Sequence, residues 1–214
     1  MLRAILIAVI SAALAWGNPP AGFKKIFNGK NLKGWHVSQV NHHGNTPWRV
    51  EKGVLLGTQS KPGNGGILLT DKKYKNFEVY LELNPDFGCD SGLFLRSSEK
   101  GEAYQVTLDY LQGGNMGGIY GERLKDVKGA PAKTWQEHWK KGEWNTLRAR
   151  IEGDVPHIQV WMNGVQITDW TDTANHAAEG ATEGMISVQV HGGKRWNESG
   201  GYHRFRNIAI KELR

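Results

Sequence analysis

The chain has 214 residues and a formal charge of +6, with 28 glycines, nine tryptophans and a single cysteine. Its length suits one domain with a sizeable core. Basic residues are interleaved with acidic ones, which argues against nucleic acid as a partner, and one cysteine excludes both an intrachain disulfide and a cysteine-based metal site.

Residues 1–17 predict a secretory signal peptide. Arg3 supplies a positive charge, residues 4–15 are apolar but short for a bilayer span, and Ala13-Leu14-Ala15 has the small-x-small pattern of a cleavage site. An uncleaved membrane anchor is the alternative. We expect residues 18–214 to form the mature domain, exported to the periplasm or the extracellular space, with no stable membrane span once the signal is removed.

The sequence beyond the signal alternates between apolar and polar residues with a period of two. This alternation runs through residues 77–83, 91–96, 104–109, 147–151, 158–162 and 186–191, and a last strand extends to Leu213. Turn signals such as Asn163-Gly164 separate the segments, and no long amphipathic helix is visible. The pattern predicts an all-β fold, a two-sheet antiparallel jelly-roll sandwich.

Several polar residues take the outward positions of these strands. One sheet of a sandwich often curves, and its outward side chains then line a shallow groove. The outward set includes Arg96, Gln105, Asp109, Gln189 and His191. Because these side chains offer many hydrogen bonds, we expect a small-molecule saccharide as the partner.

Short motifs in a fixed order support a more specific interpretation. They occupy residues 27–35, 48–55, 90–96, 104–106, 118–120, 142–145, 161–164, 189–192 and 205–208. In this order the chain resembles the 3-keto-disaccharide hydrolase domain family, whose fold is a concanavalin A-like lectin/glucanase sandwich. The motifs span nearly all of the mature chain.

The sequence departs from this family at two positions. Many relatives carry an acidic residue where this chain has Gln105, and a glutamine where it has Thr107. If that acid is catalytic, it is either missing here or supplied by another position such as Asp109.

The resemblance implies cleavage of the glycosidic bond of 3-keto glycosides by proton abstraction at carbon 2, elimination and hydration. Such an enzyme needs a base, an enolate stabiliser and a proton donor. We expect His191 to act as acid or base, Asp109 to act as base or to orient His191, and Arg96 to hold the enolate. The structural alternatives are a strand-end histidine, a turn carboxylate, and an arginine paired with Glu82 or Asp90.

Five further residues are candidates for sugar binding. Gln105 and Gln189 would hydrogen-bond hydroxyls, and Glu122 would reach the groove from a loop. Trp35 and Trp161 would offer flat apolar faces on which sugar rings stack.

No cofactor is expected. A structural Ca²⁺ is compatible with a sandwich of this type, but no fixed-spacing calcium loop occurs, and the metal content stays unassigned. Two other functions remain open, a non-catalytic carbohydrate-binding module and a conventional glycoside hydrolase with paired carboxylates.

Overall fold

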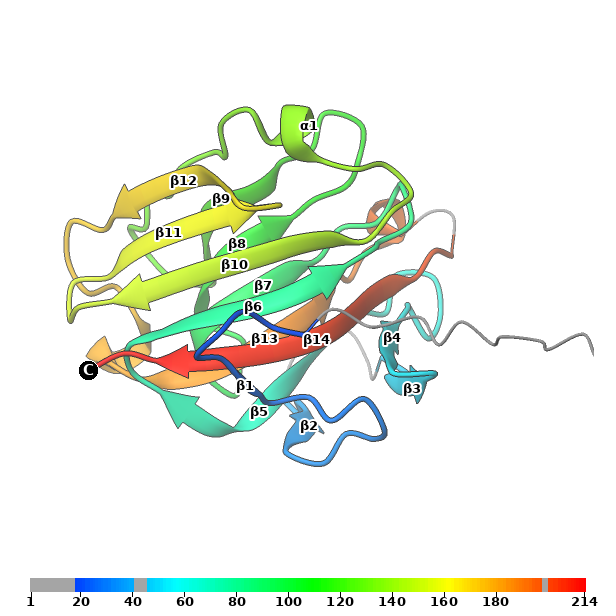
Figure 1. Cartoon of the computed structure of the whole chain (residues 1–214), viewed down its shortest axis with the longest axis horizontal. Coiled ribbons are helices and arrows are strands. Elements are labelled where there is room, and N and C mark those ends of the chain that lie inside the picture. Colours follow the sequence, from blue (N-terminus) through cyan, green and yellow to red (C-terminus); the bar gives the residue numbers. More distant parts are fainter. Residues whose placement is uncertain (1–17, 41–45, 198–199) are drawn as a thin grey trace, which may run out of the picture.

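The computed structural model describes residues 18–40, 46–197 and 200–214; the predicted signal peptide lies outside the described residues. Within this part, the strands form two antiparallel sheets of eight and six strands (Figure 1). Helical structure is limited there to α1 (Trp135–His138) and two 3-10 turns, η1 (Ala178–Gly180) and η2 (Lys194–Trp196). The predicted two-sheet antiparallel sandwich is therefore confirmed.

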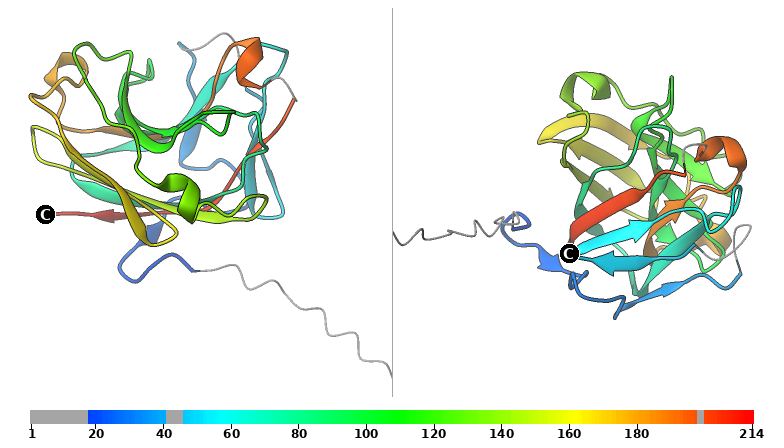
Figure 2. Two further views of the ribbon diagram at one scale, coloured as in Figure 1. Left: turned by 90° about the horizontal axis from the view of Figure 1, so that it is seen from above. Right: turned by 90° about the vertical axis from the view of Figure 1, so that its right-hand side faces the viewer.

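The two sheets lie face to face, as the turned views of Figure 2 also show. The large sheet has the order β12 (Val165–Thr171), β11 (His157–Met162), β10 (Asn145–Glu152), β6 (Phe77–Leu83), β14 (His203–Glu212), β4 (Val54–Gly57) and β3 (Arg49–Glu51), and β1 (Lys24–Lys25) pairs with β14. The small sheet has the order β2 (Trp35–Val37), β5 (Gly66–Tyr74), β13 (Gly184–Val190), β7 (Gly92–Ser97), β8 (Ala103–Leu108) and β9 (Met116–Glu122).

The period-two alternation turns one face of each sheet into the core. Leu147, Ala149 and Ile151 of β10 are fully buried, and the residues between them are half-buried. Leu93 and Leu95 of β7 enter the same core from the small sheet. Each fully buried leucine contributes about 2 kcal/mol. The opposite face of the small sheet points away from this core.

Strand pairing arranges the outer face of the small sheet in rows. In one row, Phe94 lies opposite Gln105, and Gln105 lies opposite Tyr120. Two residues further along, Gly92 lies opposite Thr107. Because directly opposed residues point to the same face of a sheet, each row crosses β7 and β8 on one side, and the first row continues onto β9.

Arg96 ends the regular course of β7. Its φ of 53° lies in the left-handed region, and a Cβ at Gly184 would come within 2.3 Å of the Arg96 carbonyl carbon. The guanidinium donates hydrogen bonds to the carbonyls of Lys75 (2.8 Å) and Gly153 (2.9 Å) and to Asn76 Oδ1 (3.0 Å). Arg96 therefore forms a bulge in β7, after which Ser97 pairs with Met185 of β13.

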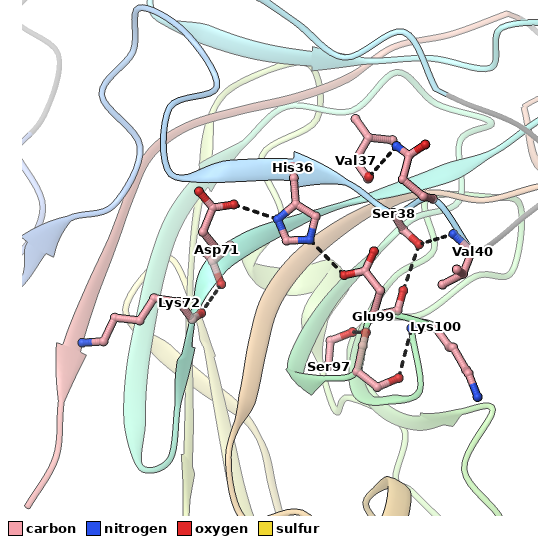
Figure 3. Close-up of polar contacts among 12 residues, drawn as sticks. His36, Val37, Ser38, Val40, Asp71, Lys72, Ser97, Glu99 and Lys100 are labelled. Atoms are coloured by element: carbon pink, nitrogen blue, oxygen red, sulfur yellow. Dashed lines mark hydrogen bonds and ion pairs between the residues drawn. The ribbon is translucent and has the colours of Figure 1, made fainter.

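The turn between β7 and β8, residues 98–102, reaches across the small sheet to β2 (Figure 3). Glu99 Oε2 lies 2.9 Å from Nε2 of His36, and the Glu99 carbonyl accepts a hydrogen bond from Ser38 Oγ (2.8 Å). His36 belongs to β2, which β5 and β13 separate from β7, so the turn crosses both of these strands. Nδ1 of His36 lies 2.7 Å from Asp71 Oδ1. We call His36, Asp71 and Glu99 the His36 clasp.

Candidate functional site

Three titratable residues meet at one end of the outer face of the small sheet. His191 follows β13, Asp90 precedes β7 and Asp109 follows β8. The amide of His191 donates to the Asp90 carbonyl (3.2 Å), and His191 Nε2 lies 3.9 Å from Asp90 Oδ2. Backbone hydrogen bonds on either side, from Leu108 to Ser91 and from Tyr110 to Cys89, place Asp109 opposite Asp90. We call His191, Asp90 and Asp109 the acid–histidine cluster.

The ring of His191 is held in a defined orientation. Its Nδ1 lies 2.5 Å from the Gly192 carbonyl oxygen, and its plane is tilted against Trp196 with 5.1 Å between ring centroids. Because a carbonyl only accepts hydrogen bonds, Nδ1 carries the proton. Nε2 is therefore the nitrogen without a proton in the neutral ring, and it is the one that faces Asp90.

Asp90 has the most informative protonation behaviour of the cluster. Its side chain is largely buried, and burial together with the negative charge of Asp109 raises its pKa from 3.8 to about 7. A hydrogen bond from the Ser91 amide opposes this rise, and the charge of Glu122 adds to it. Asp90 therefore exchanges a proton near neutral pH.

Asp109 is held where its charge acts on Asp90. Burial raises the pKa of Asp109, against the lowering effect of the Leu111 and Asn115 amides and of His191. Its buried Oδ1 has no hydrogen-bond partner among the described residues. A Cβ at Gly114 would come within 2.5 Å of that oxygen, so glycine is required beside it.

Two glutamines predicted to bind sugar lie next to the cluster. Gln105 is 5% exposed and donates from Nε2 to the Ser91 carbonyl (3.3 Å). Gln189 is fully buried, and neither atom of its amide has a hydrogen-bond partner in the part of the chain that the structure describes. An unpaired buried amide costs about 1–3 kcal/mol, so Gln189 keeps hydrogen-bonding capacity that the fold does not use.

Glu122 lies at the end of β9. Its carboxylate is partly buried, which raises its pKa, while Arg123 at 3.7 Å lowers it. Because the charge of Glu122 contributes to the raised pKa of Asp90, the two carboxylates share an electrostatic environment. Its role in binding a sugar stays a prediction.

Arg96 does not join the cluster. Six residues of extended chain, about 20 Å, separate it from Asp90. Its Nε and Nη2 donate to Lys75, Asn76 and Gly153, its buried Nη1 has no hydrogen-bond partner among the described residues, and no ion pair with Glu82 or Asp90 forms. The expectation that Arg96 holds the enolate in the same groove as His191 is therefore not met, because Arg96 lies at the other end of β7 and its guanidinium bonds the turns that carry Lys75 and Gly153.

The two predicted stacking tryptophans are not on this face. Trp35 is buried in the core, and its Nε1 donates to the Ile26 carbonyl (2.7 Å), so its ring is not available to a sugar. Trp161 belongs to β11 of the large sheet, where the Arg148 guanidinium covers its ring at 3.9 Å. The alternation predicted that Trp161 faces outward, but it carries no information about which sheet a strand joins.

The sequence reasoning missed Asp90 and Trp196 as site residues. The sequence did contain a signal for Asp90. In an extended strand, positions 90, 92 and 94 point to the same side, so Asp90 lies on the outward side together with Gly92 and Phe94. Trp196 lies in η2, and no periodic pattern predicts the contact of its ring with His191.

The described residues form two cavities of about 480 Å³ each. One lies apart from the cluster, between residues 96–102 and residues 178–185. The other is lined by Gln59, Pro62 and Lys194 and adjoins the cluster, because Gln59 Nε2 donates to the His191 carbonyl (2.9 Å). No group of three or more potential metal ligands occurs among the described residues, and His42 and His43 lie outside them. None of the described helices is long and apolar enough to cross a membrane.

Comparison with known proteins adds a family and a fold. Residues 22–211 match the family model described as the 3-keto-alpha-glucoside-1,2-lyase-like domain. A 3-keto-disaccharide hydrolase from Bacteroides thetaiotaomicron is 24% identical over 237 aligned positions, which cover 90% of this chain and 79% of that protein.

Solved structures share the sandwich. A proposed glycosyl hydrolase from Parabacteroides distasonis ATCC 8503 has a TM-score of 0.63 at 24% identity, over 89% of this chain and 99% of that one. The carbohydrate-binding module CBM66 from Bacillus subtilis has a TM-score of 0.55 at 15% identity, over 85% and 98% of the two chains. At these identities the likeness establishes the fold alone, and it agrees with the predicted concanavalin A-like class.

Proposed function

The chain belongs to the 3-keto-alpha-glucoside-1,2-lyase-like family, and on that premise we propose that it cleaves the glycosidic bond of 3-keto glycosides. The observation that carries the proposal is the buried Asp90, whose pKa is raised to about 7 beside Asp109 and His191. Titratable groups shifted toward the working pH are typical of acid–base catalysis.

The ketone supplies the chemical reason for a base. It acidifies the hydrogen on carbon 2, because the electron pair left by that proton spreads onto the carbonyl oxygen as an enolate. Return of this pair forms a double bond between carbons 1 and 2 and expels the oxygen on carbon 1, which takes up a proton. Water then adds, with its hydroxyl going to carbon 1 and a proton to carbon 2, so the net reaction is hydrolysis.

The cluster offers a group for each proton transfer. Asp90 takes the carbon-2 proton, since a carboxylate with a pKa of about 7 is a stronger base than an ordinary one. His191, protonated on both ring nitrogens, gives the proton of Nε2 to the departing oxygen and regains one from the water that adds. Asp109 strengthens the base by placing a second negative charge beside it. On this assignment Asp90 supplies the carboxylate that the family resemblance implies at the position of Gln105.

A purely carbohydrate-binding function is the main alternative. A binding module needs amides and aromatic rings but gains nothing from a carboxylate whose pKa lies near 7. The buried carboxylate pair therefore favours catalysis. A conventional glycoside hydrolase, which cleaves sugars without a ketone, is the other alternative, and the substrate comparison below separates it.

We also propose that the protein is exported and that residues 1–17 are removed. The support is the charge, length and small-residue exit of this segment. Sequencing the N-terminus of the protein recovered from the periplasm or medium tests this, because retention of Met1 would contradict it.

The test of the activity compares a glucoside with its 3-keto counterpart in D₂O. We expect cleavage of the keto form alone, with deuterium on carbon 2 of the product. Asp90→Asn should lower kcat by about 100-fold or more, the size of effect expected for loss of a general base. The matched control is Asp154→Asn, which removes a carboxylate that is 71% exposed and pairs with Lys75.

Each other outcome contradicts part of the proposal. Cleavage of the unoxidised glucoside at an equal rate would indicate conventional hydrolysis. Cleavage of neither compound, with sugar binding retained in calorimetry, would indicate a binding module. Full activity of Asp90→Asn would remove Asp90 from the mechanism.

A further inference from the structure

Two loops meet beside the acid–histidine cluster, and one side chain joins them. Residues 58–65 connect β4 to β5, and residues 191–202 connect β13 to β14. The pairing of β5 with β13 extends as far as Gly66 and Val190, and beyond this pair the ladder ends. The backbone groups that follow Val190 therefore need other hydrogen-bond partners.

Gln59 supplies these partners with its whole amide group. Its Nε2 donates to the carbonyls of His191 (2.9 Å) and Gly193 (3.0 Å), and its Oε1 accepts from the Gly63 amide (2.7 Å). The Gly63 carbonyl in turn accepts from the Gly193 amide (2.8 Å). A side-chain amide has two donor hydrogens, so Nε2 uses both of them on the segment that begins at His191.

These bonds surround the peptide group that decides which ring nitrogen of His191 carries the proton. The carbonyl of this group belongs to Gly192 and lies 2.5 Å from Nδ1 of His191, and its N–H belongs to Gly193 and donates to Gly63. In a trans peptide the C=O and the N–H point in opposite directions, so the bond to Gly63 aims the carbonyl away from loop 58–65 and toward the imidazole. Gln59 holds the peptide groups on either side through their carbonyls.

Backbone contact and a bond from the other side complete this arrangement. A Cβ at Gly65 would come within 2.2 Å of the Val190 carbonyl oxygen and 2.4 Å of the Gly192 nitrogen, so the two loops touch through their backbones. On the opposite side, the His191 amide donates to the Asp90 carbonyl (3.2 Å). The backbone of His191 is therefore held from both sides.

We propose that Gln59 is a positioning residue for the proposed reaction, because it keeps the Gly192 carbonyl on Nδ1 of His191 and so leaves Nε2 to face Asp90. This inference rests on the proposed function. Without the Gln59 amide, the Gly192 carbonyl can turn away, and the ring is free to rotate or to carry its single proton on Nε2. A ring in another orientation no longer reaches the departing oxygen, although no contact that binds the sugar is lost.

The test measures the kinetics and the tautomer of His191 in Gln59→Ala and Gln59→Glu. We expect kcat for the 3-keto glucoside to fall by roughly 10- to 100-fold, the cost of misplacing a reacting group, with KM unchanged. Gln59→Glu should match Gln59→Ala, because an ionised carboxylate fills the same space but donates to neither carbonyl. Nitrogen NMR of the neutral imidazole, assigned by the loss of its signals in His191→Gln, should change from a ring protonated on Nδ1 to a mixture of tautomers.

Thr58→Val is the matched control. The Thr58 hydroxyl donates to the Gly201 carbonyl (2.9 Å), so this variant also loses a hydrogen bond between the same two loops. That bond does not reach residues 191–193. We therefore expect the kcat, the KM and the tautomer of His191 in Thr58→Val to equal those of the wild type.

The outcomes separate this inference from the proposed function. If the wild type cleaves the keto substrate and both Gln59 variants keep its kcat and its tautomer, the positioning role is wrong and the proposed function stands. An equal fall of kcat in Thr58→Val would also overturn the role, since any weakening of the loops would then suffice. If the wild type cleaves neither the glucoside nor its 3-keto counterpart, the proposed function is wrong and the NMR signals decide on Gln59. A changed tautomer in both Gln59 variants would still support its hold on His191, whereas an unchanged tautomer would overturn it.

Discussion

Asp90 has two separable reasons for its raised pKa, its burial and the charge of Asp109. Asp109→Asn removes the second reason and leaves the first. Because a negative neighbour disfavours the ionised carboxylate, loss of that neighbour lowers the pKa of Asp90. We therefore expect the rising limb of kcat/KM against pH, close to pH 7 in the wild type, to move to lower pH in Asp109→Asn.

The pH–rate profile of the purified variant checks this shift, and Asp154→Asn provides the control for a change in overall charge. The maximal rate should also fall, since a base with a lower pKa removes a carbon-bound proton more slowly. An unchanged limb would show that Asp90 and Asp109 titrate independently. A limb that moves to higher pH would assign it to a different group.

The alternation of odd and even positions along a strand explains which site residues could be predicted from the sequence. Gln105, Asp109, Gln189 and His191 come to one face because they occupy outward positions of uninterrupted strands. Asp90 also occupies an outward position, but it was predicted only as an ion-pair partner of Arg96. What the sequence could not reveal is burial, and burial is the first cause of the raised pKa of Asp90.

At the scale of elements, the His36 clasp fixes the β7–β8 turn across the small sheet (Figure 3). Burial lowers the pKa of His36. The hydrogen bonds to Glu99 and Asp71 raise it by more than burial lowers it, so the net change is upward from 6.5. A histidine with a raised folded-state pKa stabilises the fold fully below its unfolded pKa, and this stability is lost as pH rises through the folded value. The clasp should therefore be stronger at pH 6 than at pH 9.

His36→Gln tests this dependence through thermal unfolding at the two pH values. All three side chains are more than one third exposed, so solvent screening limits the loss to less than about 1 kcal/mol. We expect the difference in Tm between wild type and His36→Gln to be a few degrees at pH 6 and close to zero at pH 9. His138→Gln is the control, because no hydrogen bond of its side chain occurs within the described residues. A difference independent of pH would mean that His36 acts through packing and not through its charge.

Elements also show where prediction from periodicity ends. The long strands β6, β10 and β14 follow from alternation, whereas β2 has three residues, too few for a period to be recognised. Trp35, which opens β2, was therefore assigned to the surface when it is a core residue. The left-handed backbone of Arg96 likewise puts a bulge into β7 that the alternation of residues 91–96 did not predict.

At the scale of the whole molecule, alternation gives the face of each strand but not the partner sheet. Both sheets of a sandwich have an outward face, and these two faces point in opposite directions. Trp161 and Gln189 both occupy outward positions, yet they lie on opposite sides of the molecule. The fold class could be predicted from strands and turns alone, whereas gathering the site required the strand order, which depends on long-range pairing.

Two buried groups make opposite contributions to the acid stability of the whole fold. Burial lowers the pKa of His203 from 6.5 to about 4, so the unfolded chain binds a proton in this window that the folded protein does not, and stability falls as pH drops. The pKa of Asp90 is raised from 3.8 to about 7, so the folded protein binds the extra proton there, and stability rises as pH drops. Each contribution amounts to a few kcal/mol, and the two windows largely overlap.

Replacing one of the two residues should therefore make the pH dependence contributed by the other measurable. We expect the free energy of unfolding in urea to change little between pH 7.5 and pH 5 in the wild type, to fall by about 1–2 kcal/mol in Asp90→Asn, and to rise by a similar amount in His203→Leu. Leucine suits this position because neither ring nitrogen of His203 has a hydrogen-bond partner in the described part of the chain. If both variants kept the pH dependence of the wild type, these two groups would not set the acid stability, and the raised pKa of Asp90 that underlies the proposed chemistry would be contradicted as well.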